Sequence, residues 1–373
     1  MRPHFTRRDV LKAALPAFSL SQLALSAQVS SKAEATKLGM PGLFRGRVVE
    51  VSHSGCLNAG KYQAEPVQQM MRAGLNELTG AGGWNDSWRL FAQPGDVVGI
   101  KVNPVGAPDI ISAPEVLREI IGGLNAAGIK NRDIVVYDRY HDQFIKAGFP
   151  QWLPDGVRWM SATKDFDLVQ HAIEGYDPDH FMDIGVTLHG YDATNLTARR
   201  SYAAKFITRE VNKLINLCVL KDHGAAGVTL SLKNLSHGLV NNVNRSHSTK
   251  GINVTGAFIP SVVSLPVIRN KAVLHILDAV KGQYQGGPGP VPQFIWEPRT
   301  LYFATDPVAL DHVGWRAIDE KRLAAGLKII TEAEPDKYIA RRIRQPEHIE
   351  IAGAMGLGEW DWEKTTVRKI ALA

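Results

Sequence analysis

Short apolar runs alternate with segments of helical spacing along most of the chain. Residues 96–103 form an apolar run after a Pro-Gly turn, 114–127 have helical spacing with a proline in the first turn, and 134–138 are again apolar. A strand, a helix and a strand joined by short loops are typical of a right-handed parallel unit. The pattern therefore predicts an α/β fold, with a mostly parallel open sheet and flanking helices.

The remaining elements follow from the same periodicities. Ser112 is expected to cap the helix at 114–127, and Asp306 before Pro307 has the composition of another helix N-terminus. The segment 161–210 mixes helical hints with polar loops and yields no assignment. Further strands are predicted at 47–53, 214–220, 228–232, 272–280, 300–305 and 367–372, and further helices at 65–78, 307–325 and 347–355.

Polar side chains follow the predicted strands. In open parallel sheets, ligands bind beyond the carboxyl ends of the strands, so groups at several such ends are expected to share one cleft. Five predicted strands end in ion-binding residues, which are Lys101 and Asn103, Asp138, Lys221 and His223, Asp278 and Lys281, and Asp306.

The stretch from Leu220 to Gly238, LKDHGAAGVTLSLKNLSHG, places costly charged groups among Leu, Val and Gly. It is either a surface loop or the wall of a site. Lysine side chains bind carboxylate or phosphate as point charges, and asparagines add neutral donors and acceptors. His237 and His247 are read either as surface loop residues or as part of the site. The predicted substrate-binding residues are Lys101, Asn103, Lys221, Lys233, Asn234 and His247, and they favour a small anionic ligand.

A divalent metal is a further hypothesis. Asp138, Asp278 and Asp306 are the predicted ligands, since carboxylates together with imidazoles suit hard or borderline ions. No tight ligand spacing such as H-E-x-x-H accompanies them. The glycine-rich segment 282–290 lacks the end of a phosphate-binding P-loop and is read as a flap or an anion-contacting loop.

The N-terminus resembles a twin-arginine export signal. Arg7 and Arg8 precede a modest apolar region, which is too short and too polar for a stable membrane span. The alternative is an amphipathic leader helix of a cytosolic protein. We expect a signal peptide at 1–26, a linker at 27–45 and one α/β domain at 46–373. This predicts a periplasmic or otherwise exported bacterial protein and the twin-arginine translocation machinery as a partner.

The composition limits the class of protein to which the chain can belong. The 373 residues are 45% hydrophobic and 21% charged, which is ordinary for a globular protein. The net charge is +6, of which residues 1–26 supply +3 from four basic residues and one acidic residue. The basic residues are spread, so no nucleic-acid partner is expected. Cys56 and Cys218 are too few for a Cys-ligated iron–sulfur cluster. They could form a disulfide in an oxidising compartment, or Cys218 could pack as a small hydrophobe.

Four motifs in order resemble the family called domain of unknown function 362. They are a Lys-x-Asn strand end at Lys101, a Lys-x-His element at Lys221, a Leu-Lys-Asn element at Lys233, and Asp-x-Val-Ala-Leu-Asp from Asp306 to Asp311. The late Gly356-Leu-Gly358 fits as well, and the resemblance covers residues 95 to 365. It implies that these motif residues act as a set, and it names no substrate. Many relatives carry ferredoxin-type cysteine clusters, which this chain lacks.

The leading hypothesis is an exported enzyme that acts on a small anionic substrate, with or without a divalent metal. His223 would be the catalytic proton-transfer group, since imidazole titrates nearest neutral pH. Asp278 and Asp306 would bind the metal or orient His223. The alternative is a non-catalytic periplasmic ligand-binding or redox-maturation factor.

Overall fold

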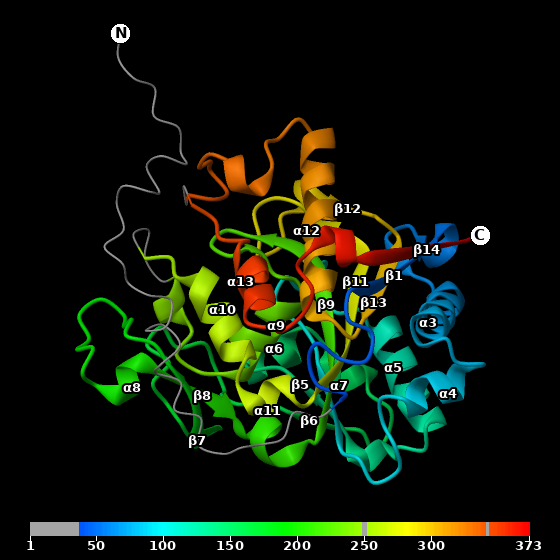
Figure 1. The fold of residues 1–373 in the computed structure, drawn as a ribbon, viewed down its shortest axis with the longest axis horizontal. Coiled ribbons are helices and arrows are strands. Elements are labelled where there is room, and N and C mark those ends of the chain that lie inside the picture. Colours follow the sequence, from blue (N-terminus) through cyan, green and yellow to red (C-terminus); the bar gives the residue numbers. More distant parts are fainter. Residues whose placement is uncertain (1–36, 248–251, 341–342) are drawn as a thin grey trace.

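The computed structural model describes residues 37–247, 252–340 and 343–373. The predicted signal peptide and the first part of the predicted linker lie outside these residues. In the described part of the chain, a mostly parallel sheet of ten strands forms the centre (Figure 1). The strands are β1 (Arg47–His53), β4 (Val98–Lys101), β5 (Ile134–Tyr137), β6 (Arg158–Met160), β9 (Lys213–His223), β10 (Gly227–Val228), β11 (Ala272–Gln283), β12 (Ile295–Trp296), β13 (Thr300–Ala304) and β14 (Thr366–Leu372).

The sheet order is β14-β1-β13-β11-β9-β4-β5-β6, with β10 beside β9 and β12 beside β11. Strands β11, β9, β4, β5 and β6 run parallel to one another. Strand β13 runs antiparallel to both of its neighbours, β11 and β1. The carboxyl ends of β4, β5 and β9 therefore meet at one edge of the sheet, and β13 ends at the opposite edge.

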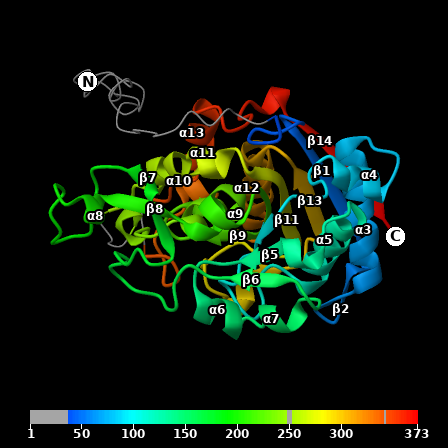
Figure 2. The same cartoon turned by 90° about the horizontal axis from the view of Figure 1, so that it is seen from below.

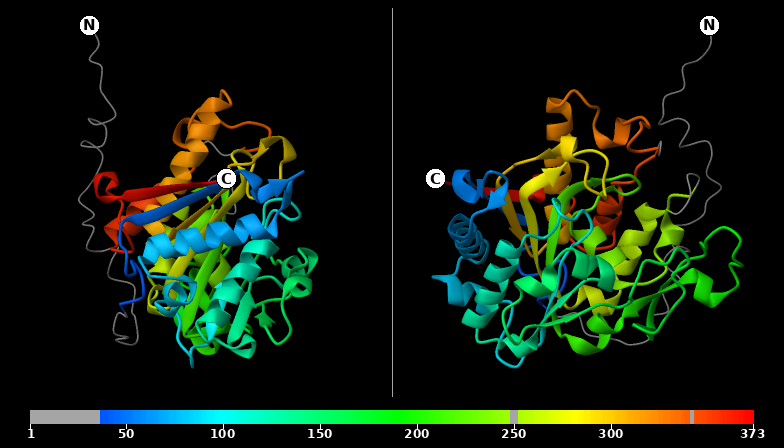
Figure 3. Two further views of the ribbon diagram at one scale, coloured as in Figure 1. Left: turned by 90° about the vertical axis from the view of Figure 1, so that its right-hand side faces the viewer. Right: turned by 180° about the vertical axis from the view of Figure 1, so that it is seen from behind.

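Helices cover both faces of this sheet, and the side views place the strands between the two layers (Figure 3). Each face has its own apolar core, because the parallel strands are buried on both sides. One layer contains α3 (Ala64–Thr79), α4 (Trp84–Arg89), α5 (Pro114–Ala126), α6 (His141–Lys146) and α7 (Phe149–Trp152), and the other contains α9 (Leu230–Leu239), α10 (Thr255–Val263), α11 (Pro266–Arg269), α12 (Pro307–Ala324) and α13 (His348–Ala354).

Smaller elements lie around this core. A two-stranded sheet of β7 (Tyr176–Asp183) and β8 (Arg200–Ala204), with α8 (Leu196–Arg199), lies on the side away from β14 (Figure 2). Strands β2 (Leu57–Asn58) and β3 (Lys61–Tyr62) form a short hairpin. Single helical turns occupy 54–56, 131–133, 206–210, 244–246, 292–294, 330–332 and 362–364.

The predicted fold class is confirmed, and most predicted elements are present. Strands β9 and β11 run three residues further than predicted, to His223 and Gln283. The predicted strand at 228–232 is wrong, because β10 ends at Val228 and helix α9 begins at Leu230. Ser112 does not cap α5; its hydroxyl donates to the Leu217 carbonyl at 2.8 Å and accepts from the Asn103 amide at 2.8 Å.

Cys56 and Cys218 are both buried and unpaired, so the alternative of a disulfide between them is wrong and the packing interpretation of Cys218 is confirmed. The Cys218 thiol contacts the Ile276 carbonyl on the neighbouring strand at 3.5 Å. Among the described residues, no helix has the length and apolar character that a membrane crossing requires.

Candidate functional site: a lysine-lined cavity at the sheet edge

A cavity of about 170 Å³ lies at the carboxyl ends of β4, β5 and β9, covered by α9. Residues of the strand ends form one wall, and α9 with the turn at 244–246 forms the other. The predicted residues that line it are Lys101, Asn103, Asp138, Lys221, His223, Lys233, Asn234 and His247, joined by Val105, Arg139, Tyr140, Gln143, Thr229, His237, Gly238, Val243, Asn244 and Pro288.

Lys101 ends β4 and is 1% exposed. Its amine donates to Asp138 Oδ1 at 2.5 Å, to the Val102 carbonyl at 2.5 Å and to Asn234 Oδ1 at 3.2 Å. Burial lowers the pKa of Lys101, and the Asp138 carboxylate opposes that shift. Because all three donors of an ammonium are used within the protein, Lys101 is a fixed charge in the wall.

Lys221 lies in the extended end of β9 and is fully buried. Its amine donates to Asn103 Oδ1 at 3.0 Å, to the Val105 carbonyl and to the Ile110 carbonyl at 3.4 Å. Burial and the neighbouring Lys233 and Lys101 charges lower the pKa of Lys221 to about 7. The three oxygen acceptors favour its ammonium form, so Lys221 also acts as a fixed group in the wall.

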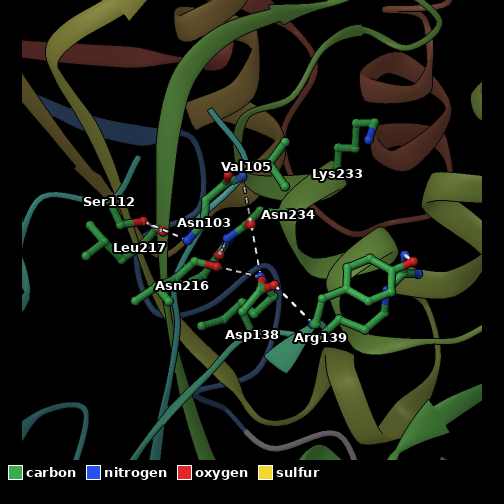
Figure 4. A network of polar contacts seen from close by, with 12 residues as sticks. Asn103, Val105, Ser112, Asp138, Arg139, Asn216, Leu217, Lys233 and Asn234 are labelled. Carbon is green, nitrogen blue, oxygen red and sulfur yellow. Dashed lines mark hydrogen bonds and ion pairs between the residues drawn. The ribbon is translucent and has the colours of Figure 1, made fainter. Parts of the chain in front are cut away.

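Lys233 differs from both. It lies on α9, is 8% exposed, and lines the cavity. Among the described residues its amine has no hydrogen-bond partner, and Figure 4 shows it apart from the dashed contacts of the network. Burial and then the Arg139 and Lys101 charges lower the pKa of Lys233 to about 7. A substantial fraction of this amine is therefore neutral at physiological pH.

Asparagines hold the cavity floor together. Asn234 Oδ1 accepts from Asn103 Nδ2 at 3.1 Å as well as from Lys101, and Asn234 Nδ2 donates to Asn216 Oδ1 at 2.7 Å (Figure 4). Asn216 Nδ2 in turn donates to Ser231 Oγ at 2.8 Å. This chain of amides ties the end of β4 and the interior of β9 to α9, so the three elements that supply the lysines keep a fixed spacing.

Three imidazoles lie at one end of the cavity. The ring centroids of His223 and His247 are 5.4 Å apart, and those of His237 and His247 are 5.3 Å apart. His223 Nδ1 accepts the Ala225 and Ala226 amides, each at 3.1 Å. In the neutral ring these contacts place the proton on Nε2, so His223 is arranged as a hydrogen-bond donor rather than as a base at that atom. Burial lowers the pKa of His237 well below its ordinary value.

Successive side chains of β9 point to opposite sides of the sheet. Lys221 and His223 line the cavity, whereas Asp222 points away and accepts the Gly287 amide at 2.8 Å. Burial raises the pKa of Asp222 to about 6. That contact holds the glycine-rich segment 282–290 against β9, which brings Pro288 to the cavity rim.

Two predicted metal ligands lie outside the cavity. Asp278 lies within β11 and accepts the Ala113 amide at the start of α5 at 3.0 Å and the Tyr62 hydroxyl at 3.0 Å. Asp306 caps α12 and accepts the amides of Val308, Ala309, Gly46 and Glu359. The expectation that Asp278 and Asp306 share the cleft with Asp138 is wrong. Strand β11 is longer than predicted, and β13 runs antiparallel and so ends at the other edge.

Within the described ranges, no three His, Cys, Asp or Glu side chains form a group that could hold a metal ion. Asp138 instead pairs with Lys101 and accepts the Tyr140 amide at 3.4 Å. Asp311, from the last family motif, accepts the Ser231 and Leu232 amides at 2.7 and 2.8 Å and so caps α9. It contributes to the site by holding the helix that carries Lys233.

Arg139 is a site residue that the sequence analysis missed. Its guanidinium lies 4.2 Å from the centroid of the Tyr140 ring and donates to the Val240 carbonyl at 3.1 Å. The sequence did contain an indication of this role, because Arg139 directly follows Asp138 at the end of a predicted strand. Thr229 was also missed; its buried hydroxyl lines the cavity and has no hydrogen-bond partner among the described residues.

A family model described as domain of unknown function (DUF362) matches residues 98–316, more than half of the chain. The chain belongs to the DUF362 family. The matched region is shorter than the resemblance predicted from the motifs, and it leaves out Gly356 and Gly358. It contains the lysines, the asparagines and His223 of the cavity.

Comparison with other proteins adds little about chemistry. No curated protein matches this DUF362 chain. Among solved structures, it is similar to a protein from Thermotoga maritima, with a TM-score of 0.33 and 12% identity over 59% of this chain and 51% of that one. It is also similar to the lactate racemase apoprotein from Thermoanaerobacterium thermosaccharolyticum, with a TM-score of 0.30 and 11% identity over 65% of this chain and 52% of that one. The chain thus spans about half the length of each, and likenesses of this size carry no argument about function.

Proposed function

We propose that this protein is an enzyme that binds a small anionic substrate in the lysine-lined cavity and transfers a proton on it. The supporting observation is a charge imbalance. Lys101, Lys221, Lys233 and Arg139 surround a cavity whose lining, among the described residues, contains one carboxylate, that of Asp138. Burying several like charges is unfavourable unless an opposite charge compensates them, and a bound anion would do so.

The size of the cavity limits the substrate. Pockets for drug-sized ligands measure about 300–1,000 Å³. A volume of about 170 Å³ suits a molecule of a few heavy atoms, such as a short carboxylic acid or inorganic phosphate. Lys101 and Lys221 would stabilise the substrate charge through their field, because their donors are already used by protein oxygens.

Lys233 is the group we assign to proton transfer. Its amine has no competing partner among the described residues, and its pKa near 7 allows it to accept and release a proton at neutral pH. In this proposal His223 has a different role from the one expected from the sequence. Its Nδ1 accepts two backbone amides, which fix the ring in the cavity wall beside His247.

Solvent deuterium uptake tests this proposal across several small acids at once. The full chain is incubated in D2O with lactate, alanine, pyruvate and malate separately, and loss of each C–H signal is followed by proton NMR. We expect exchange in at least one acid, and at least a tenfold slower rate in Lys233→Met. Lys213→Met is the matched control, because Lys213 begins β9 at the end away from the cavity.

The other outcomes contradict the proposal in different ways. Saturable binding of these acids without exchange in any of them would favour the non-catalytic ligand-binding alternative. Exchange that is equally fast in Lys233→Met would place the proton-transfer group elsewhere. If the acids neither bind nor exchange, the proposed anion site itself is wrong.

A further inference from the structure

We propose that Lys233 forms a covalent imine with a carbonyl substrate that also carries a carboxylate, that is, a 2-oxo acid. The inference rests on the proposed anion site and deepens it by naming the substrate class. With such a substrate, Lys233 promotes loss of the neighbouring proton through the imine instead of accepting that proton itself. It begins with the difference between the three lysines: the amines of Lys101 and Lys221 each have three oxygen acceptors, and that of Lys233 has none among the described residues. Of these three, Lys233 alone presents a nucleophile to the cavity.

The position of Lys233 suits covalent chemistry. A lysine becomes a nucleophile when it is desolvated or lies near another cation, because both effects favour the neutral amine. Lys233 meets both conditions, since it is buried and since Arg139 and Lys101 are the charges that act on it most. Its pKa of about 7 is consistent with this arrangement.

The reaction balances without an oxidant or a metal. The neutral Lys233 amine attacks the carbonyl carbon, a C–N bond forms, and the oxygen takes one proton from the attacking nitrogen to give a carbinolamine. The same oxygen takes a second proton from solvent, the C–O bond breaks, and water leaves to give the protonated imine. The Thr229 hydroxyl, which has no partner among the described residues, lines the cavity and can donate a hydrogen bond to the departing oxygen. The substrate carboxylate balances the charge of the iminium and of the lysine wall.

Reductive trapping tests the inference. The full chain is treated with pyruvate, glyoxylate or oxaloacetate in the presence of sodium cyanoborohydride, and adducts are located by peptide mass spectrometry. At acid concentrations well below saturation, where the unliganded amine sets the pH dependence, we expect one secondary-amine adduct, on Lys233, whose rate of formation rises with a midpoint near pH 7. Exposed lysines react with a midpoint of about 10.4.

Controls separate the two requirements of the site. Acetone supplies the carbonyl without the anion, and lactate supplies the anion without the carbonyl, so neither compound should form an adduct. Lactate should compete for the anion site and so slow the trapping of pyruvate. Lys271 is the internal control, because burial also lowers its pKa but its amine donates to the Ile207 and Val211 carbonyls. Lys233→Arg keeps the cation and should retain acetate binding while losing the adduct.

The outcomes distinguish this inference from the proposed function. An adduct on Lys101 or Lys221, or adducts spread over exposed lysines, would overturn the assignment to Lys233. No adduct with any of the three acids, together with saturable binding of acetate to the same protein, would overturn the imine and leave the anion site in place. Absence of both would overturn both.

Discussion

At the scale of single residues, the cavity is defined by how each polar atom is used. The motifs led to the correct expectation that Lys101, Lys221, Lys233 and His223 share one cavity. Their hydrogen bonds could not be predicted from the sequence, because most of the acceptors lie far along the chain from the lysines that they bind. The loop between β4 and α5 supplies the acceptors of Lys221, and α9 supplies Asn234 to Lys101. The division into two saturated lysines and one unpartnered lysine therefore needed the three-dimensional arrangement.

The Lys233 side chain should reduce stability, because its burial lowers its pKa to about 7. The unfolded chain keeps a pKa of about 10.4, so it binds more protons than the native state between these values. The destabilisation is complete below pH 7 and disappears as pH rises toward 10. We expect Lys233→Met to raise Tm at pH 6 by about 1–2 °C, which corresponds to about 1 kcal/mol for a domain of this size, and by less at pH 9.

Differential scanning calorimetry at both pH values checks this. Lys271→Met is the contrasting variant, and its Tm should fall, because it removes two hydrogen bonds to backbone carbonyls. A drop of several degrees in Lys233→Met at pH 6 would instead show that the Lys233 amine supports the fold.

Gly238 leaves room for the Lys101 side chain. A Cβ added at Gly238 would overlap Lys101 Cε, so Gly238→Ala should displace the amine from Asp138 and Asn234. We expect a loss of about 1–3 kcal/mol in unfolding free energy and weaker anion binding. Gly122→Ala in α5 is the control; its added methyl meets no heavy atom within 4 Å and should stabilise the helix by about 0.5–1 kcal/mol. Urea denaturation measures both, and an unchanged Gly238→Ala would contradict this packing.

At the scale of elements, α9 is the one whose type was predicted wrongly. The alternation of Val228 to Leu232 indicated a strand, and the side chain of Thr229, which directly precedes the helix, makes no capping hydrogen bond. The first-turn amides are satisfied by Asp311, which is 80 residues away from Ser231. A prediction from neighbouring residues misses the start of a helix when the capping side chain comes from another helix. The result is functional, because a helix places Lys233 and His237 one turn apart on the same face.

A variant of Asp306 distinguishes the helix-capping role seen in the structure from the metal-binding role expected from the sequence. Four backbone amides donate to its carboxylate, so Asp306→Asn should lower unfolding free energy by about 1–2 kcal/mol. Acetate affinity should not change, because the residue lies outside the cavity. Denaturation and calorimetric titration of the same preparation check both parts. Loss of acetate binding with stability intact would return Asp306 to the site.

At the scale of the whole molecule, the parallel core was predictable because its strands are short apolar runs joined by helices. The direction of β13 was not predictable, because an apolar run does not indicate whether its strand pairs parallel or antiparallel to its neighbours. That ambiguity is why Asp306 was grouped with residues of the opposite edge. The lengths of β9 and β11 were underestimated because polar residues interrupt the apolar pattern before each strand ends, Lys221 and Asp222 in β9 and Lys281 and Gln283 in β11.

Export remains a prediction at this scale. Replacing Arg7 and Arg8 by Lys should abolish transfer of the full chain to the periplasm, because the twin arginines are the recognised part of such a signal. Cell fractionation with an antibody to the folded domain measures it, and Lys12→Arg is the control that preserves the motif charge. Equal periplasmic amounts of the wild type and the double variant would favour the cytosolic leader helix.

The central claim is that the cavity takes up a small anion together with a proton on Lys233. Isothermal titration of acetate into the full chain at pH 8, in two buffers with different ionisation enthalpies, measures both events at once. Because a bound anion raises the pKa of a lysine from about 7, binding should be accompanied by uptake of up to about one proton. Lys233→Met should bind acetate more weakly and without proton uptake. Absence of saturable binding, or proton uptake that persists unchanged in Lys233→Met, would contradict the account.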